Sequence, residues 1–238
     1  MPDATAQPAA SRSHRLDALR GAAMLWMTAY HFSFDLNHFG WIQQNFYRDP
    51  FWTWQRCCIV SLFLFCAGGG QALALSGQQM AGRFWRRWAQ VAACALAVSL
   101  SSRVMFPDSW ISFGVLHGIA VMLVLLRFGL ARLPDAVLVA LAALAMVAPQ
   151  LWASPFFDTR WTDWLGLVTH KPITEDYVPL LPWLAPLLAG FVVTRRWPAL
   201  WKGRAPRALA WPGRWSLSYY MVHQPVLIGV LMAVQWLH

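Results

Sequence analysis

Long apolar stretches, separated by short polar or basic segments, make up most of the chain. A helix needs about 20 mainly apolar residues to cross a bilayer, and several stretches come close to that length. They cover residues 17–39, 53–76, 84–104, 110–129, 134–152, 179–195 and 214–236. We therefore predict an all-α fold, a polytopic transmembrane helix bundle with about seven spans.

The first stretch contains polar residues that a purely lipid-facing helix would exclude. In "RLDALRGAAMLWMTAYHFSFDLNHFG", Arg20, Met24, Met27, His31 and Asp35 follow one another at intervals of three or four, which places them on one face of a helix. Ionisable residues inside a membrane are costly and mark functional sites. A carboxylate one turn from a histidine can orient the ring and raise its basicity. The stripe therefore predicts a general base formed by His31 with Asp35.

Composition and charge agree with a membrane protein. Hydrophobic residues are 58% of the chain and charged residues 12%, whereas soluble domains average about 45–50% and about 25%. The net charge of +9 comes from basic residues placed between the apolar runs. That placement follows the positive-inside rule and does not indicate a nucleic-acid partner. Membrane lipids are the expected surroundings.

The basic residues also predict an orientation. In a seven-span arrangement, 14 of the 19 Lys and Arg residues fall on one side. The rule places that side, and the N-terminus, in the cytoplasm of a multi-pass protein of the cytoplasmic (inner) membrane. Residues 1–14 have no apolar core and are predicted to be a disordered cytoplasmic tail. Residues 15–238 are predicted to form a single transmembrane domain.

Three further stretches contain candidate site residues. His117 lies in "SWISFGVLHGIA" and His223 in "SLSYYMVHQPVL", both within predicted spans. A lone histidine in a helix more often packs than catalyses, yet several histidines must share one polar interior. In "DYVPLLPWLAP", Asp176 and Trp183 suit a sugar hydroxyl and a sugar ring, or equally a loop carboxylate and an interfacial tryptophan. The cysteines lack zinc-site spacing, so no metal is expected.

The residues quoted above resemble a known family. "RLDALRGAAMLWMTAYHFSFDLNHFG", "FGVLHGIA", "DYVPLLPWLAP" and "WSLSYYMVHQPVL" occur in the order seen in the heparan-α-glucosaminide N-acetyltransferase catalytic-domain family, in its short bacterial branch. The resemblance covers roughly residues 15 to 230. The first stretch is also similar to that of the acyltransferase-3 membrane O-acetyltransferases, which have an Arg and a His eleven apart, as Arg20 and His31 are.

The resemblance implies a membrane acyltransferase that uses acetyl-CoA. An acetyl (acyl) group would pass from the cytoplasmic donor to a sugar or glycan of the cell envelope on the outer face. Arg20 and Asp17 would bind the donor, and Asp176 with Trp183 the acceptor. The residues assigned to the chemistry and its proton relay are His31, Asp35, His117 and His223.

One histidine outside the helix stripe stays a candidate. In the lysosomal members that name the family, the position matching His31 resembles an asparagine, and the catalytic histidine falls in the following loop. This chain offers His38 near that place, on the acceptor side. His31 and His38 are therefore rival bases.

Other classes of protein fit parts of the same pattern. A transporter or flippase would move an unmodified substrate without consuming acyl-CoA. A haem-binding redox protein would use paired histidines as axial ligands. A non-catalytic membrane partner would use the polar residues only to hold helices together. Seven spans are few for this acyltransferase fold, which indicates either a minimal core or a homodimer.

Overall fold

The computed structural model describes residues 12–237, and the regular secondary structure of that range is helical. The α-helices are α1 (His14–His38), α2 (Pro50–Ser76), α3 (Ala81–Met105), α4 (Val115–Leu125), α5 (Asp135–Leu151), α6 (Leu180–Arg196), α7 (Arg207–Arg214) and α8 (Ser216–Trp236). A π-helical turn, Leu126–Leu130, extends α4, and three short 3-10 turns span Pro155–Phe157, Asp163–Leu165 and Pro198–Trp201. The all-α prediction is confirmed, and each of the seven predicted stretches coincides with a helix to within five residues.

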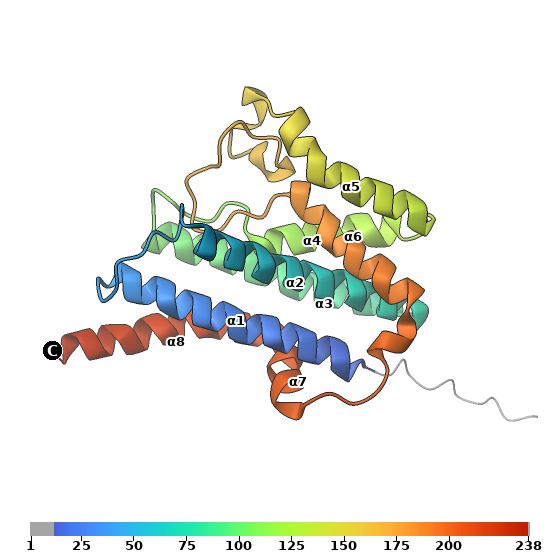
Figure 1. Cartoon of the computed structure of the whole chain (residues 1–238), viewed down its shortest axis with the longest axis horizontal. Helices are drawn as coiled ribbons and strands as arrows, with labels where there is room; N and C mark the ends of the chain where they lie inside the picture. Colours follow the sequence, from blue (N-terminus) through green and yellow to red (C-terminus); the bar gives the residue numbers. More distant parts are fainter. Residues whose placement is uncertain (1–11, 238) are drawn as a thin grey trace, which may run out of the picture.

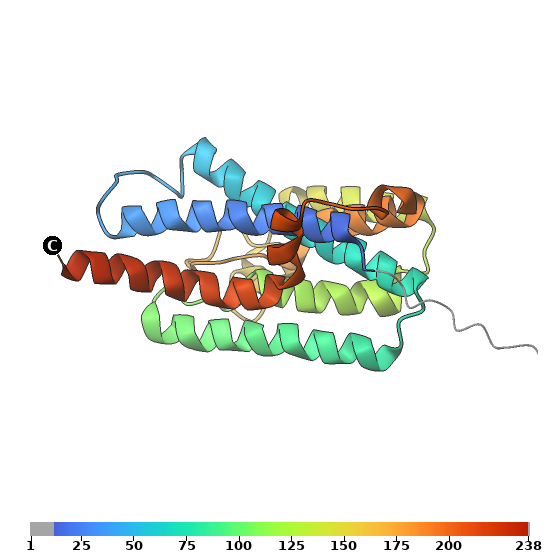
Figure 2. The same ribbon diagram turned by 90° about the horizontal axis from the view of Figure 1, so that it is seen from below.

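The helices form an elongated bundle with two distinct ends. Figure 1 shows α1, α2 and α3 running along the long axis. In the same view α6 lies between α2 and α5, and the connection that follows α5 is on the α5 side. We call the end where α1 begins and α2 ends the basic end. We call the opposite end, with connections 39–49, 106–114 and 152–179, the loop end. Figure 2 shows α1 and α8 side by side, with α8 extending beyond the loop end of α1.

Local sequence signals set the starts of the first two helices. The Ser13 hydroxyl accepts a hydrogen bond from the Leu16 N–H at 3.2 Å, which satisfies one free donor of the first turn of α1. The Asp49 side chain caps α2 in the same way, and Pro50 supplies a preset φ at its first position. Of the predicted tail, residues 1–11 lie outside the described residues. Residues 12–14 belong to the folded structure, because Ser13 is the cap and His14 begins the helix.

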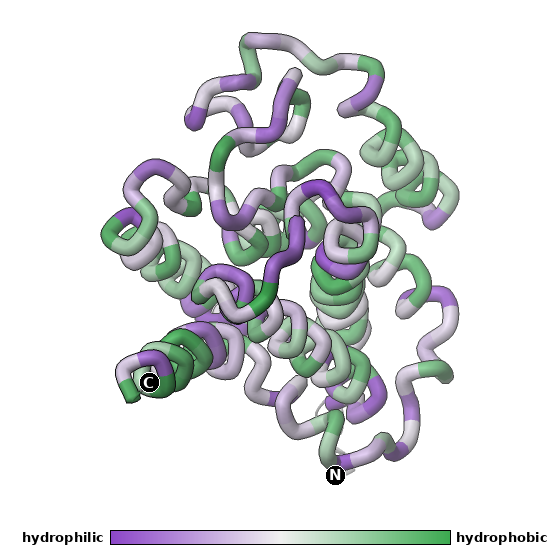
Figure 3. Tube along the Cα trace, turned by 60° about the vertical axis from the view of Figure 1, so that its left-hand side comes forward, coloured by the Kyte–Doolittle hydropathy of each residue, from purple (hydrophilic) through white to green (hydrophobic). Residues whose placement is uncertain are grey.

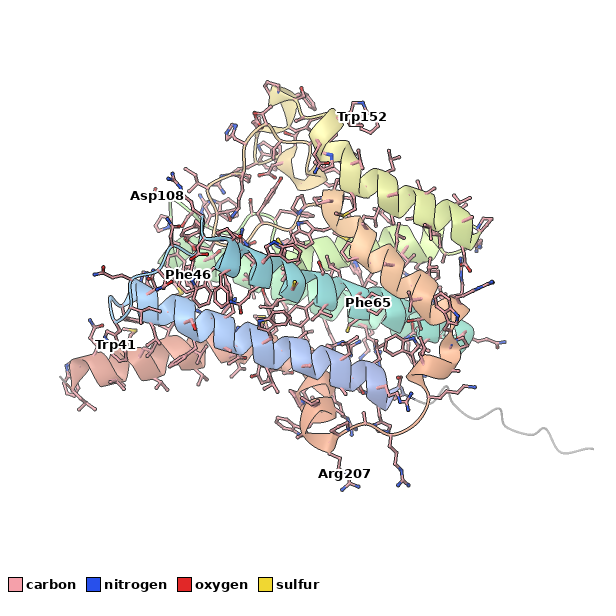
Figure 4. All side chains as sticks on the ribbon, in the orientation of Figure 1. Trp41, Phe46, Phe65, Asp108, Trp152 and Arg207 are labelled. Carbon is pink, nitrogen blue, oxygen red and sulfur yellow. The ribbon has the colours of Figure 1, made fainter. Side chains whose placement is uncertain are left out.

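Small residues allow the central helices to cross closely. A Cβ added to Gly68 on α2 would lie 1.9 Å from the carbonyl oxygen of Leu187 on α6, and one on Gly190 would lie 2.0 Å from that of Phe65. The glycine run of α2 therefore serves backbone-to-backbone packing against α6. The main buried core, which includes Leu64, Leu187 and Phe191, surrounds this crossing. A second buried cluster lies nearer the loop end, where Figure 4 shows Phe46 between α1 and α2.

Apolar surface covers much of the bundle. Figure 3 shows hydrophobic residues along the helices, and hydrophilic residues mostly in the connections and at helix ends. By length and composition, α2, α3 and α8 are long and apolar enough to cross a membrane. Val115–Leu130 and Asp135–Leu151 are shorter apolar helices. The protein is thus a multi-pass helical membrane protein, and the count of seven spans stays a prediction.

Two local features differ from the sequence pattern. The fourth helix starts at Val115 and not near residue 110, because Ser99 and Ser102 of α3 bind the backbone of Ile111 and hold it outside the helix. The short helix α7 was not predicted. It crosses α1 in near contact, since a Cβ on Gly21 would lie 1.7 Å from the Leu209 carbonyl oxygen. Figure 4 shows Arg207 pointing away from this crossing.

Candidate active site

A hydrogen-bonded group of polar side chains joins α1 to α8 in the half of α1 near the loop end. His31 Nδ1 lies 2.8 Å from Gln224 Oε1 and 3.3 Å from His223 Nε2. Gln224 Nε2 donates to Asp35 Oδ1 at 2.8 Å. His223 is 8% exposed and Asp35 is 4% exposed. The structure therefore brings together three of the four residues predicted for the chemistry, His31, Asp35 and His223.

The partners of these groups fix where the protons lie. His223 Nδ1 is 2.7 Å from the carbonyl oxygen of Tyr220, which can only accept, so His223 carries its proton on Nδ1 and leaves Nε2 as an acceptor. His31 Nδ1 faces two acceptors, Gln224 Oε1 and His223 Nε2, so it is the protonated nitrogen of His31. The lone pair of neutral His31 is then on Nε2. The hydrogen bonds of residues 12–237 include none to that atom.

Gln224 is the residue that sequence reasoning missed. The direct contact predicted between His31 and Asp35 is replaced by a relay, because the Gln224 amide accepts from the histidine and donates to the carboxylate. A glutamine has both a donor and an acceptor on one group, so it can join a ring N–H to a carboxylate. Its position beside His223 and Pro225 in "HQP" was the available signal. The other carboxylate oxygen, Asp35 Oδ2, is buried and has no partner among the described residues.

Arg20 lies in the basic half of α1, about 16 Å from His31 at the rise of a helix. Its guanidinium donates to Asp17 at 3.2 Å and to the carbonyl oxygens of Gly213 and Cys66 at 3.4 Å. The Arg20 side chain is 21% exposed and lines a cavity, whereas the Asp17 side chain is 7% exposed and does not line it. Asp17 also pairs with Arg12. Asp17 therefore holds the Arg20 guanidinium from outside the cavity.

The cavity has a volume of about 280 Å³ and lies between α1, α2, α3, α4 and the start of α8. Along α2 its lining runs from Phe63 to Ala74, a length of about 16 Å along a helix. Arg87 lines it toward the basic end. Tyr220 also lines it, and the Tyr220 ring centroid is 5.7 Å from that of His223. One elongated space thus extends from two arginines to the neighbour of the histidine pair.

His117 and Asp176 meet at the start of α4, apart from the histidine pair. His117 Nδ1 accepts from the Gly114 N–H at 3.3 Å, and its Nε2 is 3.2 Å from the Ser99 hydroxyl. Asp176 Oδ2 accepts from the Val115 N–H at 2.7 Å. Both ring nitrogens of His117 therefore have partners here, and the hydrogen bonds of residues 12–237 include none from its side chain to His31 or His223. His117 and Asp176 hold the first turn of α4, which has no hydroxyl cap of its own.

Both burial and nearby positive charges act on the Asp176 carboxyl. Burial raises the pKa of the Asp176 carboxyl, and the Val115 N–H and the charges of Lys171 and Arg56 offset only part of that rise. Burial, followed by the charge of Arg56, lowers the pKa of the Lys171 ammonium. The cations Lys171 and Arg56 therefore lie near Asp176 at the loop end, where Glu175 also acts on Lys171.

The remaining acceptor candidates are placed differently. Trp183 is half-buried on α6 and packs against the main core cluster. His38 is exposed in the last turn of α1, where its ring contacts that of Phe39 edge-on, at 5.6 Å between centroids. Its side chain takes no part in the hydrogen bonds that join His31, His223 and Gln224.

The histidine pair does not have the geometry of axial haem ligands. Two such ligands approach one iron from opposite sides. Here His223 Nε2 points at His31 Nδ1 from 3.3 Å, and the ring centroids are 5.1 Å apart. The two nitrogens therefore satisfy each other directly.

The site combines a histidine held by a polar relay with a nearby cavity that two arginines line. In a helical membrane bundle, this is an arrangement suited to an enzyme that binds an anionic ligand. A protein-family model described as heparan-alpha-glucosaminide N-acetyltransferase, catalytic, matches residues 12–225, and the chain belongs to this family. The family is one of acetyl-CoA-dependent N-acetyltransferases, so the protein is a membrane acyltransferase. Comparisons with curated proteins and with solved structures give no match.

Proposed function

We propose that the protein transfers an acetyl group from cytoplasmic acetyl-CoA to a sugar or glycan acceptor on the outer face of the cytoplasmic membrane, with seven spans and a cytoplasmic N-terminus. The observation that carries the proposal is the set of hydrogen bonds that holds His31 Nδ1. With the proton on that nitrogen, His31 Nε2 keeps a free lone pair. A base needs that arrangement.

The cavity fits the donor in charge and in shape. The anionic phosphates of acetyl-CoA suit Arg20 and Arg87, because guanidinium groups bind phosphate oxygens by charge-assisted hydrogen bonds. The apolar length along α2 suits the extended arm that ends in the thioester. When bound, acetyl-CoA supplies the acetyl group. The lining residue Tyr220 connects this space to His223, and so to His31.

The chain's own residues then move one proton. His31 Nε2 accepts the proton of the acceptor hydroxyl or amine as the new bond to the acetyl carbon forms and the carbon–sulfur bond breaks. His31 returns that proton to the CoA sulfur, so the products are the acetylated acceptor and CoA. Gln224 Oε1 stabilises the imidazolium through Nδ1, and Asp35 lies at the end of the same relay.

Acetyl transfer by His31→Ala and His38→Ala, assayed side by side with labelled acetyl-CoA and amino-sugar acceptors, tests the proposal. A general base contributes about 10²–10⁴-fold in rate. We expect a loss of that size in His31→Ala, with normal expression and normal acetyl-CoA binding, and near-normal transfer by His38→Ala. An active His31→Ala beside an inactive His38→Ala would move the chemistry to the end of α1. No transfer by the wild type to any of these probes would contradict the proposed acceptor.

A further inference from the structure

One buried polar group in the cavity wall is not used by the hydrogen bonds of the described residues. Gln71 on α2 is 6% exposed and lines the cavity. Its Nε2 atom is buried and has no hydrogen-bond partner among residues 12–237. Leaving a buried donor unpaired is unfavourable, so buried polar groups are nearly always paired. An unpaired donor on a side chain that lines a cavity therefore points to a ligand acceptor there, which the amide reaches by turning about its last side-chain bond.

The surroundings of Gln71 say what kind of acceptor this is. Its neighbour Gly70 has no side chain, and a Cβ there would lie 3.5 Å from Arg20 Nη2. The Arg20 guanidinium, which comes from α1, therefore lies beside the turn of α2 that contains Gln71. Arg20 and Arg87 are the charged groups suited to phosphates. Gln71 is neutral and lies in a wall that is otherwise apolar toward the loop end, with Ala67 and Phe63 next along α2. A neutral amide donor in apolar surroundings matches a neutral carbonyl.

We propose that Gln71 donates a hydrogen bond from Nε2 to an amide carbonyl of the pantetheine arm of the acyl donor. This inference rests on the proposed use of acetyl-CoA and adds to it a residue that selects a pantetheine thioester. The arm contains amide groups that must leave water to enter an apolar space, and each needs a partner there. Gln71 supplies one, next to the arginine that suits the phosphates, and so sets how far the thioester extends toward Tyr220.

The stability of the free protein gives the first test. Gln71→Leu keeps the side-chain size and removes the unpaired donor. We expect the thermal midpoint of the purified protein without ligand to stay equal or to rise, because an unsatisfied group is replaced by an apolar one. A residue that held the helices together would give a lower midpoint. Gln55→Leu is the matched control on the same helix, at a position outside the cavity where Gln55 accepts from Trp26.

The binding of CoA gives the second test, measured by calorimetry in detergent. One neutral hydrogen bond corresponds to about 3- to 10-fold in affinity. We expect Gln71→Leu to lower the affinity for CoA by that factor and Gln55→Leu to leave the affinity unchanged. With ¹³C placed in the pantetheine carbonyls, the infrared band of one carbonyl should lie at lower frequency in the wild-type complex than in the Gln71→Leu complex, because a hydrogen bond weakens the C=O bond.

The outcomes separate the two proposals. A wild-type protein that binds no CoA contradicts the proposed function and this inference with it. CoA binding that is equal in the wild type and Gln71→Leu overturns the role of Gln71 alone. Weaker binding without a change in the carbonyl band also overturns it, because Gln71 would then act on the shape of the cavity and not on the carbonyl.

Discussion

His31 and His223 lie 192 residues apart in the chain, and their imidazole nitrogens Nδ1 and Nε2 are 3.3 Å apart in the structure. This contact joins the first helix to the last one. It also fixes both tautomers, because His223 is anchored on the Tyr220 carbonyl. The candidate base is therefore oriented by α8, and Asp35 on its own helix reaches it only through Gln224.

The relay predicts the effect of changing Gln224. Gln224→Leu removes the acceptor of the His31 Nδ1 proton and the donor to Asp35, and hydrogen bonds to charged groups are worth about 1.5–3 kcal/mol. We expect kcat to fall by about 10-fold or more, with the KM for acetyl-CoA unchanged. Steady-state kinetics at varied donor concentration would measure this.

Exchanging the amide of Gln224 and the carboxyl group of Asp35 distinguishes a hydrogen-bonded relay from simple packing. Gln224→Glu alone places a carboxylate against Asp35 and should lower kcat. Adding Asp35→Asn supplies an amide donor to the new Glu, so the double variant should regain much of the activity. A double variant no better than Gln224→Glu would show that the relay does not orient His31.

The cavity predicts a loss of donor affinity when Arg20 is removed. Arg20→Ala deletes a charge-assisted hydrogen bond to phosphate, which corresponds to about 10- to 150-fold weaker binding of acetyl-CoA. Arg20→Lys should recover part of that affinity, but a lysine cannot form the bidentate hydrogen bonds of a guanidinium to phosphate. Asp17→Asn should have a smaller effect, since Asp17 only positions the arginine. Calorimetric titration measures all three, and normal binding by Arg20→Ala would assign Arg20 to anchoring at the membrane interface.

Asp176 predicts a pH dependence of stability. Its pKa in the fold is raised by burial, so the native protein binds this proton more tightly than the unfolded chain does. The contribution of Asp176 to stability should therefore be greatest below its ordinary pKa and decline as pH rises through the raised value. Asp176→Asn keeps an oxygen for the Val115 N–H and should remove that decline.

Thermal midpoints of the wild type, Asp176→Asn and Asp176→Ala across pH 4 to 8 check this prediction. Asp176→Ala loses the cap of α4, which typically costs about 0.5–2 kcal/mol. It should be the least stable of the three near pH 4. A wild-type midpoint that follows that of Asp176→Asn at every pH would contradict the prediction.

The proposed orientation is tested by cysteine labelling from either side of the membrane. Gln78 lies in the exposed connection after α2, and Ile173 is exposed in the long connection after α5. Cys57 is exposed, so the background carries Cys57→Ser. We expect Gln78→Cys to react only from the cytoplasm and Ile173→Cys only from outside. Reaction of both from one side would contradict the seven-span topology.

The sequence by itself determined the helices, because apolar runs of sufficient length and the caps at Ser13 and Asp49 are local signals. It also determined the stripe on α1, since the spacing of Arg20, His31 and Asp35 along one helix fixes a shared face. The same spacing placed the arginine near one end and the histidine toward the other, as the structure shows.

Only the tertiary structure decided which of those residues act together. The link through Gln224 and the cavity between five helices depend on segments far apart in the chain, and no local pattern encodes such distances. For the same reason, the sequence did not show that His117 and Asp176 both bind the first turn of α4, or that Trp183 packs against the main core. A buried polar side chain takes its role from whichever group lies opposite it, and the packing of the helices determines which group that is.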